Sequence, residues 1–208
     1  MKRRIAFLAA LGFAVMASAQ PPAPGVATAP PAPVPLIDRA SALHGSALVE
    51  ALRKGGYVLF MRHARQGGPQ NEAPCTQANL VTEGVAQARK VAAALHELRI
   101  PIGAVRASRQ CRAIETARLL DVGEVEITQD LNPGIDATPE LHGARLKRLA
   151  EMPPSGGNTL LVSHGQASSR EAEKLQLELA EIVVYRPDGK GGTMPLARIK
   201  LEDWDALR

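Results

Sequence analysis

Two short apolar runs that each end in a histidine constrain this chain more than any other feature. Residues 57–61, YVLFM, run directly into Arg62 and His63. Residues 159–163, TLLVS, run in the same way into His164. Short apolar runs bounded by turn signals are typical of strands that are buried on both faces of a sheet. Ligands of open α/β sheets bind at the carboxyl ends of such strands, so we expect both histidines at one edge of a sheet.

Strand-like and helix-like stretches alternate along the rest of the chain. Strands are expected at residues 57–61, 102–107, 125–131, 159–163, 182–185 and 197–199. Helices are expected at residues 41–54, 82–98, 108–120, 139–151 and 168–179. Thr82 and Ser108 are the expected N-terminal caps of two of these helices, and Gly189, Gly191 and Gly192 suit a hairpin turn. The alternation predicts an α/β fold, a three-layer sandwich whose mostly parallel central sheet has helices on both faces.

The first 19 residues have the layout of a signal peptide. Three basic residues at positions 2–4 precede an apolar run at residues 5–16, and Ala-Ser-Ala follows at residues 17–19. This small-x-small pattern is the one after which signal peptidase cuts. The apolar run is well short of the ~20 residues that a membrane span requires, so we expect cleavage rather than an anchor. The processed chain is then periplasmic or secreted, without stable membrane insertion.

The remainder divides into a linker and one domain. Residues 20–36 are almost all Pro, Ala, Val and Gly, which predicts an extended linker. Residues 37–208 are long enough for one folded domain with its own core. The formal net charge is +4, but three of the basic residues stand in the leader, so the processed chain is close to neutral. Aromatic residues make up only 3% of the chain and interleave with no basic run, so no nucleic-acid partner is expected.

The histidines and cysteines outside the two apolar runs predict no metal site. No group of His, Cys and carboxylate residues has the spacing of metal ligands, so neither a metal nor another cofactor is expected. His44, His96 and His142 fall on predicted helices, where we expect them to be solvated. Cys75 and Cys111 belong to a chain bound for an oxidising compartment, which permits a disulfide between them.

A third strand end supplies the chemistry of an anion site. Residues 108–112, SRQCR, open a predicted helix directly after a strand. A helix N-terminus offers free N–H groups and partial positive charge to an anion, and Arg112 adds a bidentate fork. With Arg62, this arginine can hold the oxygens of a phosphoryl group in transfer. A neutral His63 can attack phosphorus, since nearby cations lower the pKa of its ring, and His164 can donate hydrogen bonds to the transferring group.

Four segments resemble, in the right order, the motifs of one known family. Residues 58–64, VLFMRHA, resemble the Arg-His-Gly signature of the histidine phosphatase superfamily, also called the phosphoglycerate mutase-like family. The other three segments are similar to its Leu-Thr-x-x-Gly-x-x-Gln-Ala, Ser-x-x-x-Arg-x-x-x-Thr-Ala and second-histidine motifs, and they stand at residues 80–88, 108–117 and 160–165. Each segment alone is a weak signal, and the ordered set is a strong one.

This resemblance implies a mechanism and a set of roles. His63 is then the nucleophile that forms a phosphohistidine, and Arg62, Arg112 and His164 bind the phosphoryl group. The implied activity is that of an exported phosphatase that hydrolyses phosphate monoesters. Its partners are phosphorylated small molecules, glycans or proteins as substrates.

The chain also departs from the family pattern. Ala64 replaces the usual Gly, and Arg65 stands where many relatives carry Glu, so Arg65 either contacts substrate or is a solvated surface residue. No obvious general acid follows the Thr-Ala motif. Asp136 is preferred to Glu140 for this role, because its place in the middle of a loop with apolar neighbours can raise its pKa. The alternative is that no dedicated acid exists and that good leaving groups, such as those of phosphohistidine or acyl phosphates, are preferred.

Two other functions remain open at this stage, together with the pairing of the cysteines. One is a non-catalytic phosphate-binding or anion-binding module of the same fold. The other, a phosphomutase, is less well supported, because the stretch from Ala117 to Ser163 leaves little room for a lid that would exclude water. The segments that carry Cys75 and Cys111 both converge on the predicted pocket, so we expect a disulfide between them, with buried free thiols as the alternative.

Overall fold

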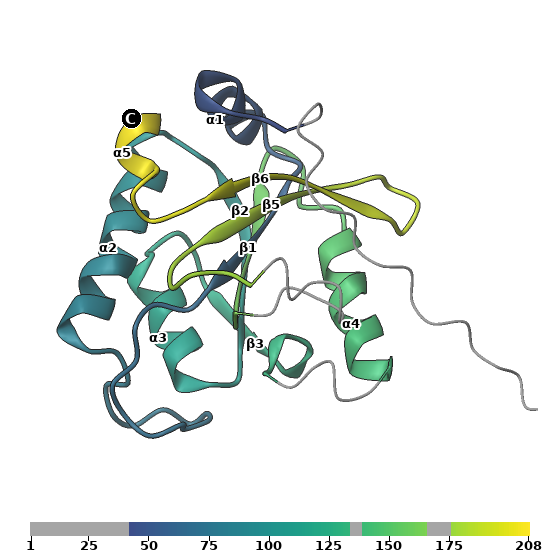
Figure 1. The fold of residues 1–208 in the computed structure, drawn as a ribbon. Coiled ribbons are helices and arrows are strands. Elements are labelled where there is room, and N and C mark those ends of the chain that lie inside the picture. The colour runs from purple at the N-terminus through teal and green to yellow at the C-terminus, as the bar shows by residue number, and fades with distance from the viewer. Residues whose placement is uncertain (1–41, 134–138, 166–175) are drawn as a thin grey trace, which may run out of the picture.

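The computed structural model describes residues 42–133, 139–165 and 176–208, which form one six-stranded sheet with helices on both faces (Figure 1). The strands are β1 (Val58–Arg62), β2 (Ile102–Ser108), β3 (Val125–Thr128), β4 (Asn158–Ser163), β5 (Ile182–Pro187) and β6 (Thr193–Ile199). The helices are α1 (Gly45–Lys54), α2 (Thr82–Glu97), α3 (Cys111–Leu119), α4 (Pro139–Ala150) and α5 (Trp204–Leu207), with a 3-10 turn, η1, at Gln129–Leu131.

The sheet has the strand order β3-β2-β4-β1-β5-β6, and its first four strands are parallel. β1 lies against β4 with Arg62 opposite Ser163, and β2 lies on the other side of β4. β5 and β6 are antiparallel and form the predicted hairpin over the glycine-rich turn. The predicted α/β class with a mostly parallel sheet is confirmed. Because β1, β2 and β4 run in the same direction, their carboxyl ends meet at one edge of the sheet.

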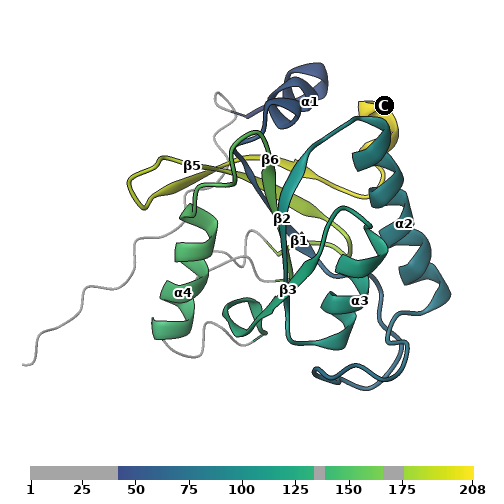
Figure 2. The same cartoon turned by 180° about the vertical axis from the view of Figure 1, so that it is seen from behind.

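The alternation of side chains along β1 sends successive residues into two separate cores. Leu59 and Met61 belong to the larger core, together with apolar residues of α1, α2, α3 and α5. Val58 and Phe60 belong to the smaller core, which is closed by Leu149 of α4. Figures 1 and 2 show the resulting layers, with α4 on one face of the sheet and α2 and α3 on the other. Every side chain from Val58 to Met61 is therefore fully buried, which explains the continuous apolar run.

Both predicted helix caps are wrong. Gln110 is the N-cap of α3, and Ser108 is instead the last residue of β2. Val81 is the N-cap of α2, so Thr82 is already helical and caps nothing with its side chain. In the sequence, Ser108 stands at a point where both a strand end and a cap are reasonable. The parallel pairing of β2 with β3 carries the strand one residue further than predicted.

Other predicted bounds differ at their ends. The expected first helix begins at Gly45, and the strand expected to reach residue 131 ends at Thr128, where η1 follows. Most of the expected helix at 168–179 lies outside the described residues, and its final part, residues 176–179, is not helical. The short C-terminal helix α5 was not predicted, although its Trp204 is completely buried. Among the residues that the structure describes, no helix has the length and apolar character to cross a membrane.

The expected solvation of His142 is wrong. His142 lies on α4 and is only 5% exposed, and Arg145, one turn further along the same helix, is 2% exposed. His44 and His96 are exposed as predicted. The periodicity of this segment indicates a helix but does not show that its polar residues face the sheet, because an inward polar face has the same spacing as an outward one.

Candidate active site

The carboxyl ends of β1, β2 and β4 place four predicted site residues around one cavity of about 390 Å³. Arg62 ends β1 and His63 follows it, His164 follows β4, and Arg112 stands in the first turn of α3, two residues after its N-cap. His63, Arg112 and His164 are only 6%, 5% and 8% exposed, so they form a buried floor. The rest of the lining consists of Arg65, Gln66, Gln70, Pro133, Gly165 and Leu179.

The backbone fixes the proton of His63 on one ring nitrogen. Nδ1 lies 2.8 Å from the carbonyl oxygen of Ala64, and a carbonyl only accepts, so Nδ1 carries the proton. Nε2 then holds a lone pair, which accepts a hydrogen bond from Nε of Arg112 at 3.1 Å. Burial, together with the charges of Arg112 and Arg62, lowers the pKa of His63 to about 4 against a partial opposing effect of the Ala64 carbonyl. His63 is therefore neutral near pH 7, as a nitrogen nucleophile must be.

The guanidinium of Arg112 contacts both histidines and the side chain of Gln110, the N-cap of its own helix. Besides its bond to His63, its Nη2 lies 3.2 Å from Nδ1 of His164, and its Nη1 donates to Oε1 of Gln110 at 2.9 Å. A guanidinium has no acceptor, so Nε2 of His63, which faces Arg112, carries a lone pair. Burial and the neighbouring Arg62 lower the pKa of Arg112, which remains a cation.

Arg62 has a buried donor that faces no described partner. Its Nη1 donates to the carbonyl of Leu177 at 2.7 Å, which orients the guanidinium, whereas its buried Nε has no hydrogen-bond partner among the described residues. Buried N–H groups are normally paired, so a donor of this kind in a cationic cavity is suited to an anion. Gly165 leaves the space for the side chain, because a Cβ there would lie 3.2 Å from the guanidinium. Sequence reasoning missed this role of Gly165.

His164 stands against His63 at the floor of the cavity. Their ring centroids are 5.2 Å apart in an edge-to-face arrangement. Nε2 of His164 lies 2.8 Å from Oγ of Ser108. Burial, Arg112, His63 and further arginines lower the pKa of His164 to about 2. Both histidines are therefore neutral near pH 7.

Residues of the other motifs hold the backbone around the nucleophile. Oγ1 of Thr116 accepts from the backbone N–H of Ala64 at 3.1 Å and donates to the carbonyl of Arg112 at 2.7 Å, so one hydroxyl joins β1 to α3. Oε1 of Gln87 accepts from the N–H of Arg65 at 2.9 Å. Gly84 lies so close to the same segment that a Cβ would stand 2.1 Å from the carbonyl oxygen of Arg65. The segment after His63 is thus fixed by α2 and α3 together.

Comparison with known proteins agrees with this geometry. Residues 58–133 match the family model of the histidine phosphatase superfamily (branch 1). This match covers just over a third of the chain. It supports the predicted resemblance over the matched part, which contains Arg62, His63 and Arg112. No curated protein matches the chain.

Solved structures share the fold of this chain at low identity. The protein histidine phosphatase SixA, solved in complex with tungstate, is 19% identical, with a TM-score of 0.53 over 71% of this chain and 98% of its own. A putative alpha-ribazole-5'-P phosphatase from Escherichia coli is 17% identical, with a TM-score of 0.54 over 71% of this chain and 98% of its own. The alpha-ribazole phosphatase from Shigella flexneri is 16% identical, with a TM-score of 0.53 over 70% of this chain and 96% of its own. At these identities the likeness shows the fold alone.

The two cysteines join the loop after His63 to α3. Cys75 and Cys111 form a disulfide, and Cys111 is the first residue of α3, directly before Arg112. Two backbone bonds run beside it, from the N–H of Cys111 to the carbonyl of Asn71 at 2.8 Å and from the N–H of Ala73 to the carbonyl of Arg109 at 2.9 Å. The loop and the helix that presents Arg112 therefore move as one unit.

The rim of the cavity carries a cation whose role the sequence left open. Arg65 lines the cavity but is half-exposed and forms an ion pair with Glu83 at 2.8 Å. Arg109 does not line the cavity; its N–H donates to the side chain of Asn132 at 2.9 Å. Among the described residues of the lining, three are arginines and none is a carboxylate, so the cavity attracts anions.

The structure does not identify the expected general acid. Asp136 lies outside the described residues. Glu140 is exposed in the first turn of α4 and does not line the cavity.

In the part of the chain that the structure describes, no group of three or more His, Cys, Asp or Glu residues could hold a metal ion.

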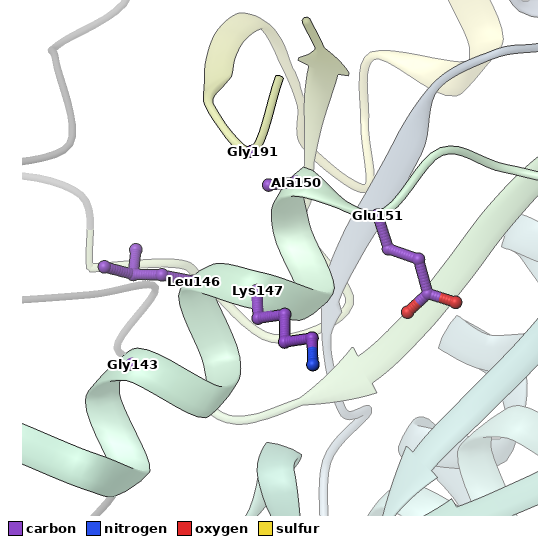
Figure 3. Close-up of a pocket in the computed structure, with 6 residues that line it drawn as sticks. All are labelled: Gly143, Leu146, Lys147, Ala150, Glu151 and Gly191. Atoms are coloured by element: carbon purple, nitrogen blue, oxygen red, sulfur yellow. The ribbon is translucent and has the colours of Figure 1, made fainter. Parts of the chain in front are cut away.

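A second hollow of about 490 Å³, shown in Figure 3, has neither His63 nor His164 in its lining. It is formed by α4 and the turn between β5 and β6, and it is lined by Gly143, Leu146, Lys147, Ala150, Glu151 and Gly191. Its two charged residues have opposite signs, and it contains no histidine or cysteine. This hollow lacks the groups that phosphoryl transfer requires.

Proposed function

We propose that this chain is an exported phosphatase that hydrolyses phosphate monoesters through a phosphohistidine on His63. One observation carries the proposal: the Ala64 carbonyl holds the proton of His63 on Nδ1, so that Nε2 presents a lone pair inside a buried cavity lined by arginines. This is the protonation state that attack on phosphorus requires. The arginines supply the positive charge that a transferring phosphoryl group needs.

The first half of the reaction transfers the phosphoryl group to the enzyme. An anion entering the cavity competes with His63 for Arg112, and the lone pair of Nε2 becomes available. Nε2 then forms a bond to phosphorus while the phosphorus–oxygen ester bond breaks. The leaving oxygen takes one proton from a general acid or from solvent water and departs as the alcohol. Arg62 and Arg112 hold the non-bridging oxygens through this step.

The second half returns the enzyme to its starting state. The oxygen of a water molecule attacks phosphorus, the bond between phosphorus and Nε2 breaks, and inorganic phosphate is released. Nε2 recovers its lone pair, and the proton on Nδ1 stays with the Ala64 carbonyl throughout. His63 therefore needs no change of tautomer during the cycle.

Two further parts of the proposal rest on other observations. Export to the periplasm or the exterior rests on the leader-like residues 1–19 and on the cysteine pair, which suits an oxidising compartment. Binding of a phosphate-like oxyanion is supported by the SixA structure of the same fold, which was solved with tungstate. The substrate is a phosphorylated small molecule, glycan or protein.

The test is turnover of an aryl phosphate by the purified protein. We expect hydrolysis by the wild type and trapping of acid-labile phosphate on it by rapid quench. We expect neither with His63→Ala. His96→Ala is the matched control, because His96 is an exposed histidine on α2, and it should retain wild-type activity. Wild-type rates in His63→Ala would remove His63 from the chemistry.

The same experiment distinguishes the phosphatase from a non-catalytic anion-binding module. The contact of Arg112 with the reactive lone pair of His63 also suits a site that binds an anion without transfer. A binding module would bind tungstate or vanadate and would neither turn over nor label. A phosphomutase would instead transfer the trapped phosphate to a second hydroxyl of its substrate.

A further inference from the structure

A carboxylate that the proposed phosphoryl transfer does not use is fully buried beside Arg62. Glu181 directly precedes β5 and is 0% exposed. Its backbone carbonyl accepts from the N–H of Arg62 at 3.0 Å, which continues the antiparallel pairing of β5 with β1 one residue beyond Met61 and Ile182. A buried ionised carboxylate is costly unless several donors satisfy it, so the partners of Glu181 show what it holds in place.

Three charged side chains form a row on one face of the sheet. Residues opposite each other on antiparallel strands point to the same face, so Arg62 and Glu181 share a face. Val183, two positions further along β5, lies on this face too and is paired with Arg198 of β6. Nε of Arg198 donates to Oε1 of Glu181 at 2.6 Å. Arg62, Glu181 and Arg198 therefore alternate in charge across β1, β5 and β6.

The same carboxylate holds the turn that orients Arg62. Oε2 of Glu181 accepts from the backbone N–H of Glu178 at 2.6 Å. Nη2 of Arg198 donates to the carbonyl of the residue before Leu177 at 3.2 Å. Leu177 stands between these two points, and its own carbonyl accepts from Nη1 of Arg62 at 2.7 Å. The acceptor that fixes the guanidinium is thus held on both sides by the Glu181–Arg198 pair.

Glu181 also supplies a negative charge behind a cavity that is lined by cations. Arg62, Arg65 and Arg112 line the cavity, with no carboxylate among the described residues of the lining, and like charges at short range repel one another. Burial lowers the pKa of Arg62, and the carboxylate of Glu181 opposes this effect. Because Glu181 does not line the cavity, it offsets part of this charge without standing where an anionic substrate would bind.

We propose that Glu181, paired with Arg198, is a positioning residue that fixes the guanidinium of Arg62 in the orientation that binds the phosphoryl group. The catalytic consequence rests on the proposed function, whereas the fixed orientation of Arg62 does not. A misplacement of about 1 Å in the groups that surround a reaction can cost about a hundredfold in rate. A residue behind Arg62 can therefore control turnover without touching the substrate.

Glu178 offers a matched control on the same turn. Its carboxylate is exposed and pairs with Lys200 at 2.7 Å. Glu178→Gln removes this charge but keeps the backbone N–H that donates to Glu181. Glu181→Gln removes the charge beside Arg62, and its amide has a single oxygen for the two donors that the carboxylate satisfies.

The first experiment observes the Nε–H of Arg62 by ¹H–¹⁵N NMR. In the wild type we expect one sharp signal that exchanges slowly with solvent, because this nitrogen is buried and the guanidinium is held by the carbonyl of Leu177. In Glu181→Gln the signal should broaden and exchange faster, and in Glu178→Gln it should stay as in the wild type. An unchanged Arg62 signal in Glu181→Gln would overturn the inference.

The second experiment is a double-mutant cycle on kcat/KM with an aryl phosphate. We expect Glu181→Gln alone to lower kcat/KM roughly tenfold to a hundredfold and Glu178→Gln to keep it. Glu181 has nothing left to position once the Arg62 side chain is removed, so Glu181→Gln should cause no further loss in Arg62→Ala. Losses that multiply in full would show that Glu181 acts independently of Arg62, and the inference would fail.

Arg198→Lys tests the same pair if Glu181→Gln does not fold. A lysine keeps the positive charge beside Glu181 but lacks the planar fork that also reaches the turn before Leu177. It should change the Arg62 signal in the same direction and lower kcat/KM by less, and a wild-type signal would contradict the inference. If the signals change as expected but the wild type hydrolyses no phosphate ester, the positioning role holds and the proposed function fails.

Discussion

Nε of Arg112 donates a hydrogen bond to Nε2 of His63 at 3.1 Å, so the cation that is expected to hold the phosphoryl group also contacts the nitrogen that is expected to attack it. The contact keeps His63 neutral and orients its lone pair toward the arginine. It also implies that an anion must draw Arg112 away before His63 can react. Substrate binding and exposure of the nucleophile are thus coupled through one side chain.

Arg112→Lys should therefore lose most activity although it keeps the positive charge. A lysine cannot reproduce the three directed donors that contact His63, His164 and Gln110. We expect kcat/KM to fall by roughly a hundredfold or more, the loss typical of removing one donor to a transition state. Vanadate, a mimic of the pentavalent geometry, should bind correspondingly more weakly. Arg118→Ala, an exposed arginine at the end of α3, is the control, and equal effects of the two substitutions would contradict the assignment.

The lowered pKa values of His63 and His164, about 4 and about 2, predict how stability depends on pH. A histidine whose folded-state pKa is below its unfolded value near 6.5 stabilises the fold above pH 6.5, because only the unfolded chain gains its proton as the pH falls. As the pH falls from 6.5 to 5, protonation of each histidine in the unfolded chain should lower the free energy of unfolding by about 2 kcal/mol. Urea titrations at pH 6.5 and pH 5 measure this change in the wild type and in the variants His63→Gln and His164→Gln. In each variant, the part of the pH dependence that comes from the replaced histidine should be lost. A variant that keeps the full wild-type dependence would show that its ring is not held neutral.

The disulfide between Cys75 and Cys111 should contribute to both stability and activity. It closes a loop with a sequence separation of 36 residues, for which the chain-entropy model gives roughly 3–4 kcal/mol. Cys75→Ala should lower Tm, and it should also lower kcat/KM, because Cys111 opens the helix that presents Arg112. Thiol titration of the protein, denatured without a reductant, tests the bond itself: two free thiols would exclude it.

The proton donor to the leaving group can be found from substrate dependence. If Asp136 is the donor, Asp136→Asn should slow hydrolysis of alkyl phosphates far more than that of a nitrophenyl phosphate, whose leaving group needs no proton. The basic limb of the pH profile should flatten in the same variant. Glu140→Gln is the matched substitution, and we expect it to have little effect, since Glu140 is exposed outside the cavity. Equal rates of Asp136→Asn on both substrates would exclude Asp136, and a wild type active only on activated phosphates would mean that no dedicated acid exists.

The amino-acid sequence by itself determined the fold class, the resemblance to one family and the strand ends at which the site residues stand. The apolar run before His63 predicts a strand buried on both faces because all its side chains are apolar, and a polar residue after such a strand must lie at an edge of the sheet. The order of the four motifs along the chain indicated the resemblance to the family. This reasoning depends only on local pattern, which explains why it located β1, β4 and α2 to within a residue or two.

Only the tertiary structure decided which atoms of these residues meet. The tautomer of His63 follows from the carbonyl of Ala64, after β1, and from the guanidinium of Arg112 on α3. Ser108 was predicted to be a helix cap, because a local pattern cannot show that the pairing of β2 extends to it and turns its hydroxyl toward a histidine 56 positions away. The burial of His142 was missed for the same reason: helical periodicity gives the spacing of a face, and only packing against the sheet decides which way that face is turned.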